Sequence, residues 1–378
     1  KAVSLTGGQI GIKTDSSHTK ARIRSISTRR MQKALEEGYI VIAAGFQGTD
    51  EDFNITTLGR GGSDTTAVAL ASVLGADQCE IYTDVDGVYT TDPRVLPEAR
   101  RVSSISYDEM LELASLGASV MHNRSIEFAK KYNVPIHVRS SLSDITGSMI
   151  IDRPELPDRA VCGAAMTKNE ARISILGVPD VPGTSLEIFS RLADRKITVD
   201  MIVQNVGEEG KSDVSFTVPN GELEETLQAV SEAAKLVGAS EITHDQDVAK
   251  VSVVGLGMAK QTGIAEKMFA ALADAGVNIQ MITTSEIKIS ALVSREQALP
   301  ALRTVHREFE LEKIDETIGG RLRPPTKRLD EADAIEVINR LQKTGMEGLT
   351  IDEIDLDESQ SRIALHGIPN HPGVAAKL

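Results

Sequence analysis

The sequence has no tryptophan, and aromatic residues make up only 3% of its 378 residues. Its apolar fraction of 41% must therefore fill the core mainly with aliphatic side chains, alanine and methionine. It has only two cysteines, Cys79 and Cys162, which are far apart and form no Cys-x-x-Cys pair. This scarcity excludes a disulfide framework and a zinc-finger type of site, and it favours a reducing, cytoplasmic compartment.

Positive charge is also in short supply, because 41 Lys and Arg stand against 55 Asp and Glu, a formal net charge of −14. An acidic chain of this kind repels nucleic-acid phosphates and anionic lipid, so we expect neither as a partner. No apolar run is long enough to cross a bilayer, so we expect no membrane span. His18, His122 and His137 lack metal-ligand spacing, and we therefore predict no metal site built from protein side chains.

Residues 1–157 alternate apolar strands with helical stretches, which predicts an α/β sandwich with a mainly parallel sheet. Strands are expected at 39–43, 79–83 and 134–138, and helices at 27–37, 64–74, 107–114 and 119–131. A polar, proline-rich stretch at 152–158 predicts a domain boundary. The sequence begins at Lys1 rather than Met and ends at Leu378 inside an expected helix, so we expect a fragment of a longer protein.

After that boundary one phrase occurs three times: a strand, a turn and a glycine at a helix start, closing at Gly183, Gly263 and Gly373. In the first two copies a helix, two strands and a second helix follow, in the β-α-β-β-α-β order of a ferredoxin-like unit. We therefore expect two units, at 170–247 and 248–318, and the start of a truncated third at 359–378. A charged linker with one helix at 330–344 is expected to fill 319–358.

The strongest local signal is Gly-Arg-Gly-Gly-Ser-Asp at 59–64, directly before an expected helix. Glycines let the backbone approach a ligand, Ser63 or Asp64 can cap the helix, and a helix N-terminus favours an anion. Arg60 adds a guanidinium that can hold a carboxylate or phosphate through two hydrogen bonds. The alternative interpretation is a capped glycine turn with a surface arginine. The segment is not a Walker A loop, because no Gly-Lys-Ser/Thr follows the glycines.

A second segment, Thr-Asp-Val-Asp-Gly-Val-Tyr-Thr-Thr-Asp-Pro-Arg at 83–94, ends an apolar strand, where open α/β sheets bind ligands. Asp84 and Asp86 can take turn positions or serve a metal–phosphate group. Tyr89 can flank a base, and Arg94 can meet phosphates. Asp-Gly and Asp-Pro pairs also form ordinary turns, so that interpretation stays open.

These two segments, with Ser-Ile-Ser-Tyr-Asp-Glu-Met at 104–110 and Val-Pro-Ile-His-Val-Arg-Ser-Ser at 134–141, resemble the aspartate kinase family of the amino-acid kinase superfamily. The repeats resemble that family's tandem ACT domains, and the resemblance covers about residues 3–318. It implies transfer of the γ-phosphoryl group of ATP, used with Mg²⁺, to the side-chain carboxylate of L-aspartate, giving 4-phospho-L-aspartate.

The resemblance also implies a role for each segment. Arg60, with the neighbouring Gly61, Gly62 and Ser63, would hold the substrate, and Asp64 would orient a catalytic lysine. The nucleotide site would consist of Thr83, Asp84, Tyr89, Arg94 and Ser119.

The sequence departs from the family pattern in two places. The family's opening Lys-Phe-Gly-Gly motif, whose lysine is expected to stabilise the transferred phosphoryl group, does not occur. Gly-Ala-Ser-Val at 117–120 stands where the family usually has Gly-Ala-Lys-Val, and Ser119 is too short and neutral to replace that charge. We therefore expect this polypeptide to be weak or inactive as a kinase.

Two alternatives to an aspartate kinase follow from these observations. One is a catalytically deficient regulatory subunit that senses amino acids. The other is a related kinase for glutamate, acetylglutamate or a nucleotide, although those relatives usually lack ACT tails.

For the repeats, the resemblance implies a feedback site for lysine, threonine or both, formed where ACT units pair across a homodimer. Asp180 could meet an ammonium group, and the helix start at Gly183 could receive a carboxylate. The predicted effector residues are Asp180, Gly183, Ser185, Asp200, Gln204 and Asn205, with Asn278, Ile279, Thr284 and Ser285 in the second copy. The alternative is that these are ordinary turn and edge residues.

Overall fold

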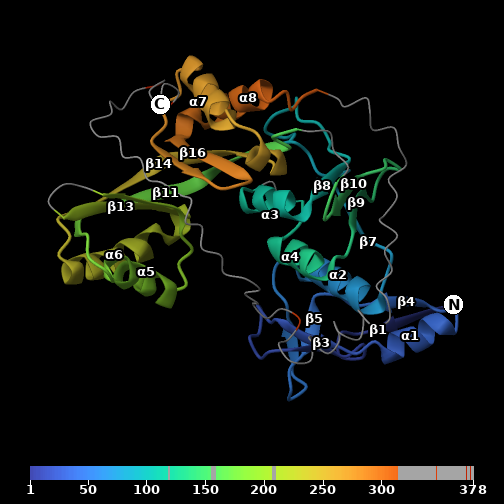
Figure 1. Cartoon of the computed structure of the whole chain (residues 1–378). Helices are drawn as coiled ribbons and strands as arrows, with labels where there is room; N and C mark the ends of the chain where they lie inside the picture. The colour runs from blue at the N-terminus through green and yellow to red at the C-terminus, as the bar shows by residue number, and fades with distance from the viewer. Residues whose placement is uncertain are drawn as a thin grey trace.

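The computed structural model describes residues 1–117, 120–154, 159–206 and 210–313, together with Met346, Pro372 and Ala375. In these ranges the chain forms an N-terminal α/β part and two repeat units that share one sheet (Figure 1). Apart from the three single residues, the expected linker and third repeat lie outside the described residues. Among the residues described, no helix is both long enough and apolar enough to cross a membrane.

The N-terminal part follows the predicted alternation of strands and helices. The predicted helix at 119–131 begins only at Asn123, because His122 caps it there. The elements in chain order are β1 (Ala2–Leu5), β2 (Ile12–Thr14), β3 (Ile23–Ile26), α1 (Arg29–Glu36), β4 (Ile40–Ala43), β5 (Gln47–Thr49), β6 (Ile55–Thr57), α2 (Gly62–Leu74), β7 (Cys79–Thr83), β8 (Ser104–Ser106), α3 (Tyr107–Ser115), α4 (Asn123–Tyr132), β9 (Ile136–Ser140) and β10 (Ser148–Ile151).

The sheets of this part are mixed. In the order β7-β9-β10-β8, the outer pairs run parallel and the central pair β9–β10 antiparallel. β1 and β4 pair in parallel, and β3-β2-β5-β6 form a separate sheet. α2 packs on β7 and on α4. The α/β class with parallel strand pairs is confirmed, and the antiparallel pairs are an addition to it.

The strands of the repeat units form one sheet in the order β12-β13-β11-β14-β16-β15. In the view of Figure 1, α5 and α6 lie below this sheet and α7 and α8 above it. The elements are β11 (Gly163–Pro179), α5 (Thr184–Asp194), β12 (Asp200–Val206), β13 (Lys211–Val218), α6 (Leu223–Val237), β14 (Glu241–Val254), α7 (Ile264–Asp274), β15 (Met281–Thr284), β16 (Lys288–Ser294) and α8 (Ala298–Glu308), with 3₁₀ turns at Asn220–Glu222, Leu256–Lys260 and Arg295–Gln297.

The long strands β11 and β14 belong to both repeat units. Residues 172–176 of β11 pair with β13 on one side and with residues 241–245 of β14 on the other. Residues 163–167 of β11 pair instead with residues 250–254 of β14, which continue to β16. The strand that completes the second unit therefore precedes the first unit in the chain. The predicted boundary at residue 170 falls inside β11, between these two halves.

The second repeat unit packs on the N-terminal part through α3. Glu109 forms a capping box with Ser106 at the start of α3, and its Oε1 accepts from the Leu256 N–H at 2.9 Å. Lys288 on β16 forms an ion pair with Glu112 of the same helix at 2.8 Å. A residue that stabilises the helix start therefore also ties the repeats to the N-terminal part.

A buried charge cluster joins three strands of the shared sheet. Lys250 on β14 is only 3% exposed, and its Nζ lies 2.9 Å from Glu170 Oε1 and 2.5 Å from Asp200 Oδ2. Glu170 lies where the register of β11 is irregular, and Asp200 begins β12. Burial alone would lower the pKa of Lys250, but the carboxylates of Glu170 and Asp200 outweigh burial and raise it. The ammonium is therefore charged and fixes β12 to the centre of the sheet.

We predict that Lys250→Met destabilises the chain by about 3–5 kcal/mol, because it leaves the Glu170 carboxylate buried without its cation. Urea unfolding followed by circular dichroism measures the loss. The double variant Lys250→Met with Glu170→Gln should recover most of it, since only the half-exposed Asp200 then lacks its cation. A Lys250→Met chain as stable as the parent would contradict this role of the cluster.

Candidate functional site

The glycine turn before α2 is shaped by close packing. Gly59 and Gly61 have left-handed φ angles of +80° and +70°. A Cβ atom on Gly61 would lie 2.3 Å from the Cβ of His122, and one on Gly59 would lie 2.5 Å from the carbonyl oxygen of Thr19. Both the backbone conformation and the lack of space therefore require glycine at these positions.

The start of α2 offers donors without partners. In the described part of the chain no side chain caps this helix, and the backbone N–H groups of Ser63 and Asp64 have no hydrogen-bond acceptor. Arg60 is exposed beside them and pairs with none of the residues that the structure describes. Unpaired N–H groups, the helix dipole and a guanidinium together favour an anion. The structure thus brings Arg60, Gly61, Gly62, Ser63 and Asp64 to one helix start suited to a carboxylate or phosphate.

Two residues at the start of α4 hold this turn in place. Arg124 donates from its two terminal nitrogens to the carbonyl oxygens of Leu58 and Ala21, both at 2.6 Å. The Nδ1 atom of His122 accepts from the Arg124 N–H at 3.3 Å, and its ring lies against Gly61. Sequence patterns do not single out Arg124, because its acceptors are backbone carbonyls, which any residue can supply.

Asp64 is close enough to β7 for its charge to act there. Burial raises the pKa of Asp64, although the Ser63 hydroxyl at 3.5 Å and His122 partly offset this. Burial, followed by the charges of Asp64 and Glu80, raises the pKa of the Cys79 thiol to about 12. A thiol with such a pKa stays protonated at neutral pH and is no nucleophile. The glycine turn and β7 therefore belong to one electrostatic environment.

The second predicted segment begins at the carboxyl edge of the parallel pair β7–β9. Thr83 Oγ1 donates to Asp84 Oδ1 at 3.1 Å. The carbonyl oxygen of Thr83 accepts from the Ser141 N–H, just beyond β9, at 2.8 Å. Thr83 and Asp84 thus lie at the sheet edge where ligands of α/β folds bind.

Farther along this segment, the predicted residues already form hydrogen bonds with neighbouring aspartates. Tyr89 donates to Asp86 Oδ1 at 2.9 Å. Arg94 donates from Nε and Nη2 to the Asp92 carboxylate at 2.8–3.2 Å, so its charge is partly neutralised. Ser119 lies outside the described residues, and its place near a nucleotide stays a prediction.

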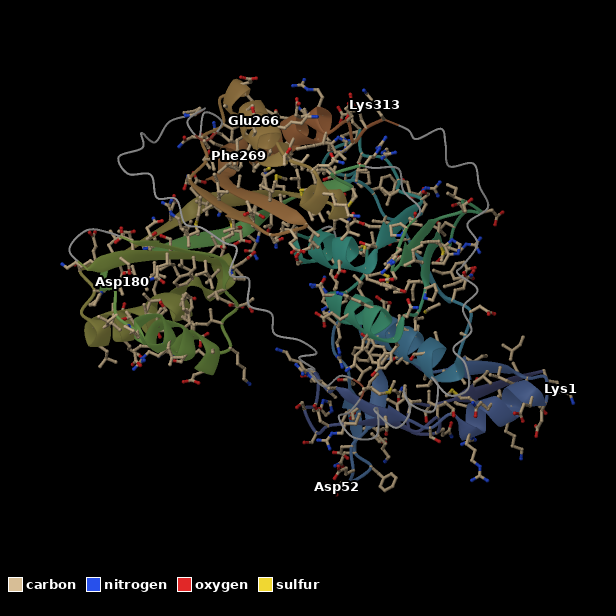
Figure 2. All side chains as sticks on the ribbon, in the orientation of Figure 1. Lys1, Asp52, Asp180, Glu266, Phe269 and Lys313 are labelled. Carbon is tan, nitrogen blue, oxygen red and sulfur yellow. The ribbon has the colours of Figure 1, made fainter. Side chains whose placement is uncertain are left out.

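Two of the predicted effector residues, Ser185 and Gln204, meet at one end of the first repeat unit. Ser185 Oγ donates to Gln204 Oε1 at 3.2 Å, and Gln204 Nε2 donates to Ser212 Oγ at 3.4 Å. Gly183 precedes α5 with a left-handed φ of +98°, and no described side chain caps this helix. Asp180 is exposed on this unit, remote from Lys1 of the N-terminal part (Figure 2). The helix start and a polar strand end therefore face the same edge.

Asp200 and Asn205 occupy different settings. The carboxylate of Asp200 is held by Lys250, which lowers its pKa against the opposing effect of burial. Asn205 is exposed near the end of β12. An effector would have to share Asp200 with a buried lysine.

In the second repeat unit the predicted residues also divide. Thr284 and Ser285 are exposed at the end of β15, in the positions that correspond to Gln204 and Asn205. Ile279 packs against the apolar core of its unit. The backbone N–H of Asn278 donates to a glutamine side chain at 3.4 Å. The predicted residues at the end of β15 are thus exposed, whereas those before its start already make packing or hydrogen-bond contacts.

The chain matches known families along its length. The amino acid kinase family matches residues 1–140, and ACT domains match residues 171–238 and 251–309. An aspartate kinase of Pseudomonas putida is 50% identical over 313 residues, which is 82% of this chain and 76% of that protein.

Two solved structures of E. coli aspartokinase III have the same fold. One, a complex with aspartate and ADP in the R-state, has a TM-score of 0.68 at 28% identity, covering 82% of this chain and 70% of that one. The other, a complex with lysine and aspartate in the T-state, has a TM-score of 0.66 at 27% identity, covering 82% and 69%. With its amino-acid kinase domain and two ACT domains, the chain belongs to the aspartokinase family.

Proposed function

We propose that the chain transfers the γ-phosphoryl group of ATP to the side-chain carboxylate of L-aspartate. The uncapped start of α2, with Arg60 beside it, is the observation that carries this proposal. A dicarboxylate substrate needs cationic and N–H donors for one carboxylate while the other attacks phosphorus. E. coli aspartokinase III, which shares the fold, has been solved with aspartate and ADP.

In this reaction a carboxylate oxygen of aspartate forms a bond to the γ-phosphorus of ATP. The bond from that phosphorus to the β–γ bridging oxygen breaks, so the products are 4-phospho-L-aspartate and ADP. Negative charge spreads over the phosphoryl oxygens in the transition state, and catalysis therefore depends on positioning and nearby cations. Arg60 and Ser63 would hold the substrate, and Asp64 would orient the catalytic lysine of the family's opening motif, which this sequence does not contain.

The nucleotide would lie along Thr83, Asp84, Tyr89 and Arg94, with Ser119 near its phosphates. Mg²⁺ supplies charge neutralisation between the phosphate oxygens when it is bound. Among the residues that the structure describes, no group of three or more His, Cys, Asp or Glu could hold a metal ion. We propose that Mg²⁺ enters with the nucleotide, because the phosphate oxygens supply ligands for it.

A second candidate is an amino-acid-sensing subunit with little or no kinase activity. Ser119, which stands where the family usually has a lysine, favours this alternative. The intact glycine turn and its supporting Arg124 contacts favour the enzyme, because amino-acid sensing by the ACT domains does not use the start of α2.

We predict that Arg60→Gln lowers kcat/KM for aspartate about ten- to hundredfold, the cost of one charge-assisted hydrogen-bonded contact. The KM for ATP should change less than about twofold, because Arg60 is assigned to the substrate. A coupled ADP-release assay with MgATP and L-aspartate measures both.

The matched control is Arg30→Gln, which removes an exposed arginine from α1. It should behave like the parent chain. Equal losses in both variants would remove the assignment of Arg60. If the parent chain shows no measurable turnover, the assay is repeated with a segment added that carries the family's opening Lys-Phe-Gly-Gly motif. Turnover would then favour the enzyme, and its absence would favour the sensing subunit.

We further propose that the ACT domains bind lysine, threonine or both, and that they pair in a cytoplasmic homodimer. The uncapped start of α5 would receive the carboxylate of the amino acid, and the linked Ser185 and Gln204 would contact its polar atoms. Lysine is present in the T-state structure of E. coli aspartokinase III. Asp180 and Asn205, with Thr284 and Ser285 from the second unit, would complete the set.

We predict that Gln204→Ala weakens the binding of L-lysine or L-threonine about tenfold or more, because it removes the residue that links α5 to β12. Calorimetric titration of the purified chain measures the affinity. Gln228→Ala, an exposed glutamine on α6 of the same unit, is the control and should leave binding unchanged. Unchanged binding in Gln204→Ala would exclude this residue from the effector site.

A further inference from the structure

The loop at residues 84–103 carries most of the proposed nucleotide site, yet it contains no helix or strand among its described residues. Its order therefore depends on individual contacts. An isolated β-bridge joins Tyr89 to Arg101, and the N–H of Val88 donates to Ser148 Oγ at 2.9 Å. These contacts lie within the N-terminal part and do not involve the ACT domains.

Thr90 is the point at which this loop meets the regulatory part. Its N–H donates to the carbonyl oxygen of Arg100 at 2.8 Å, and its Oγ1 accepts from the Arg100 N–H at 3.1 Å. The carbonyl oxygen of Thr90 accepts from the Ala164 N–H, at the start of β11, at 2.7 Å. Its Oγ1 also lies 3.0 Å from Nε2 of His306. Thr90 is fully buried, so water cannot replace any of these partners.

His306 comes from α8 of the second ACT domain and is 1% exposed. Burial lowers its pKa, and Arg100 adds to this, while Glu312 and Glu98 oppose it. Nδ1 lies 3.7 Å from Glu312 Oε2, an oxygen with no hydrogen-bond partner in the described residues. The arrangement fits a neutral ring with its proton on Nδ1, facing Glu312. Nε2 then accepts the hydroxyl proton of Thr90, whose oxygen is left free to accept from Arg100.

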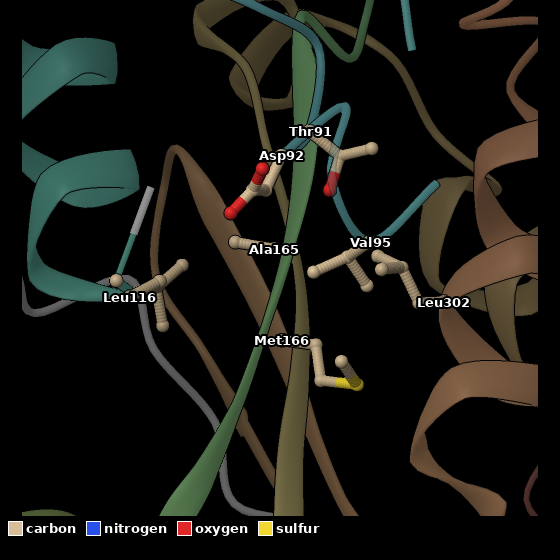
Figure 3. A pocket seen from close by; sticks show the side chains of 8 residues that line it. Thr91, Asp92, Val95, Leu116, Ala165, Met166 and Leu302 are labelled. Carbon is tan, nitrogen blue, oxygen red and sulfur yellow. The ribbon is translucent and has the colours of Figure 1, made fainter. Parts of the chain in front are cut away.

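Where α8 meets the 84–103 loop, polar contacts lie beside a small pocket. Arg100 Nε donates to the carbonyl oxygen of Leu311, just after α8, at 3.0 Å. Beside these contacts lies a pocket of about 50 Å³, bordered by Thr91 and Val95 of the loop and Leu302 of α8 (Figure 3). Val95 of the loop also packs against the apolar core that contains Leu302 of α8. The hydrogen bonds add directional contacts to this packing.

We propose that His306 is a positioning residue for the nucleotide: through Thr90 it holds the 84–103 loop in the shape that binds MgADP and MgATP. This inference rests on the nucleotide site proposed above. A shift of α8 would withdraw the acceptor of Thr90 and loosen the loop. The second ACT domain thus acts on nucleotide affinity without touching the nucleotide.

The test compares His306→Leu, which removes the acceptor, with His306→Gln, which keeps a polar atom at the ε position. Calorimetric titration with MgADP should show an affinity about three- to tenfold weaker in His306→Leu, with partial recovery in His306→Gln. Hydrogen exchange of the peptide spanning residues 88–102 should be faster by a similar factor. The control His244→Leu, an exposed histidine on β14, should change neither quantity.

Thr90→Val and Thr90→Ser approach the same contact from the loop. Thr90→Val should reproduce the loss in MgADP affinity, whereas Thr90→Ser, which keeps the hydroxyl, should bind MgADP like the parent chain. The double variant Thr90→Val with His306→Leu should lose no more MgADP affinity than Thr90→Val alone. Lysine or threonine binding should remain saturable in all of them, which separates positioning from general unfolding. Unchanged loop exchange in His306→Leu overturns the inference. A parent chain that binds no MgADP overturns the nucleotide site instead, while loop exchange still decides whether His306 orders the loop.

Discussion

The structure depends on the pairing of β11 with β14. Each strand serves both ACT domains, because residues 163–167 and 250–254 complete one unit while residues 172–176 and 241–245 complete the other. Ala165 and Val254, from the same pair, are buried in the core of the kinase domain. A change in the twist or register of this strand pair would therefore alter the packing of all three domains. Two independent ferredoxin-like units on a flexible tether would lack this property.

Polar contacts set the geometry around this shared pair. Lys250 fixes the start of β12, the strand that carries Gln204, to the centre of the sheet. Glu109 and Lys288 join α3 to the second ACT domain, and Thr90 and His306 join the 84–103 loop to α8. A displaced buried hydrogen bond is costly, so such contacts favour discrete arrangements over gradual deformation. Discrete arrangements are what a regulated enzyme requires.

The sequence predicts much of the fold and of the candidate site wherever a feature depends on residues close together in the chain. Gly59 and Gly61 were recognisable because their left-handed turn and close neighbours require glycine. The repeats were recognisable because each preserves the same strand, turn and helix start. The sharing of β11 by both units could not be predicted, since a single sequence does not indicate which strands distant in the chain pair with each other. Arg124 and His306 were missed for a related reason, because their partners are backbone carbonyls or one hydroxyl far along the chain. Asp200 was singled out as an effector residue, but nothing in the sequence showed that Lys250 would hold it.

The central claim is that the ACT domains and the nucleotide loop are coupled through these shared elements. It is tested most directly by titrating the chain with MgADP in the absence and presence of saturating L-lysine or L-threonine. The account predicts that one of these amino acids changes the MgADP dissociation constant by about 5- to 150-fold, the range common for allosteric coupling. By linkage, MgADP must change the affinity for that amino acid by the same factor. An MgADP affinity that stays the same while an amino acid binds saturably would contradict the account.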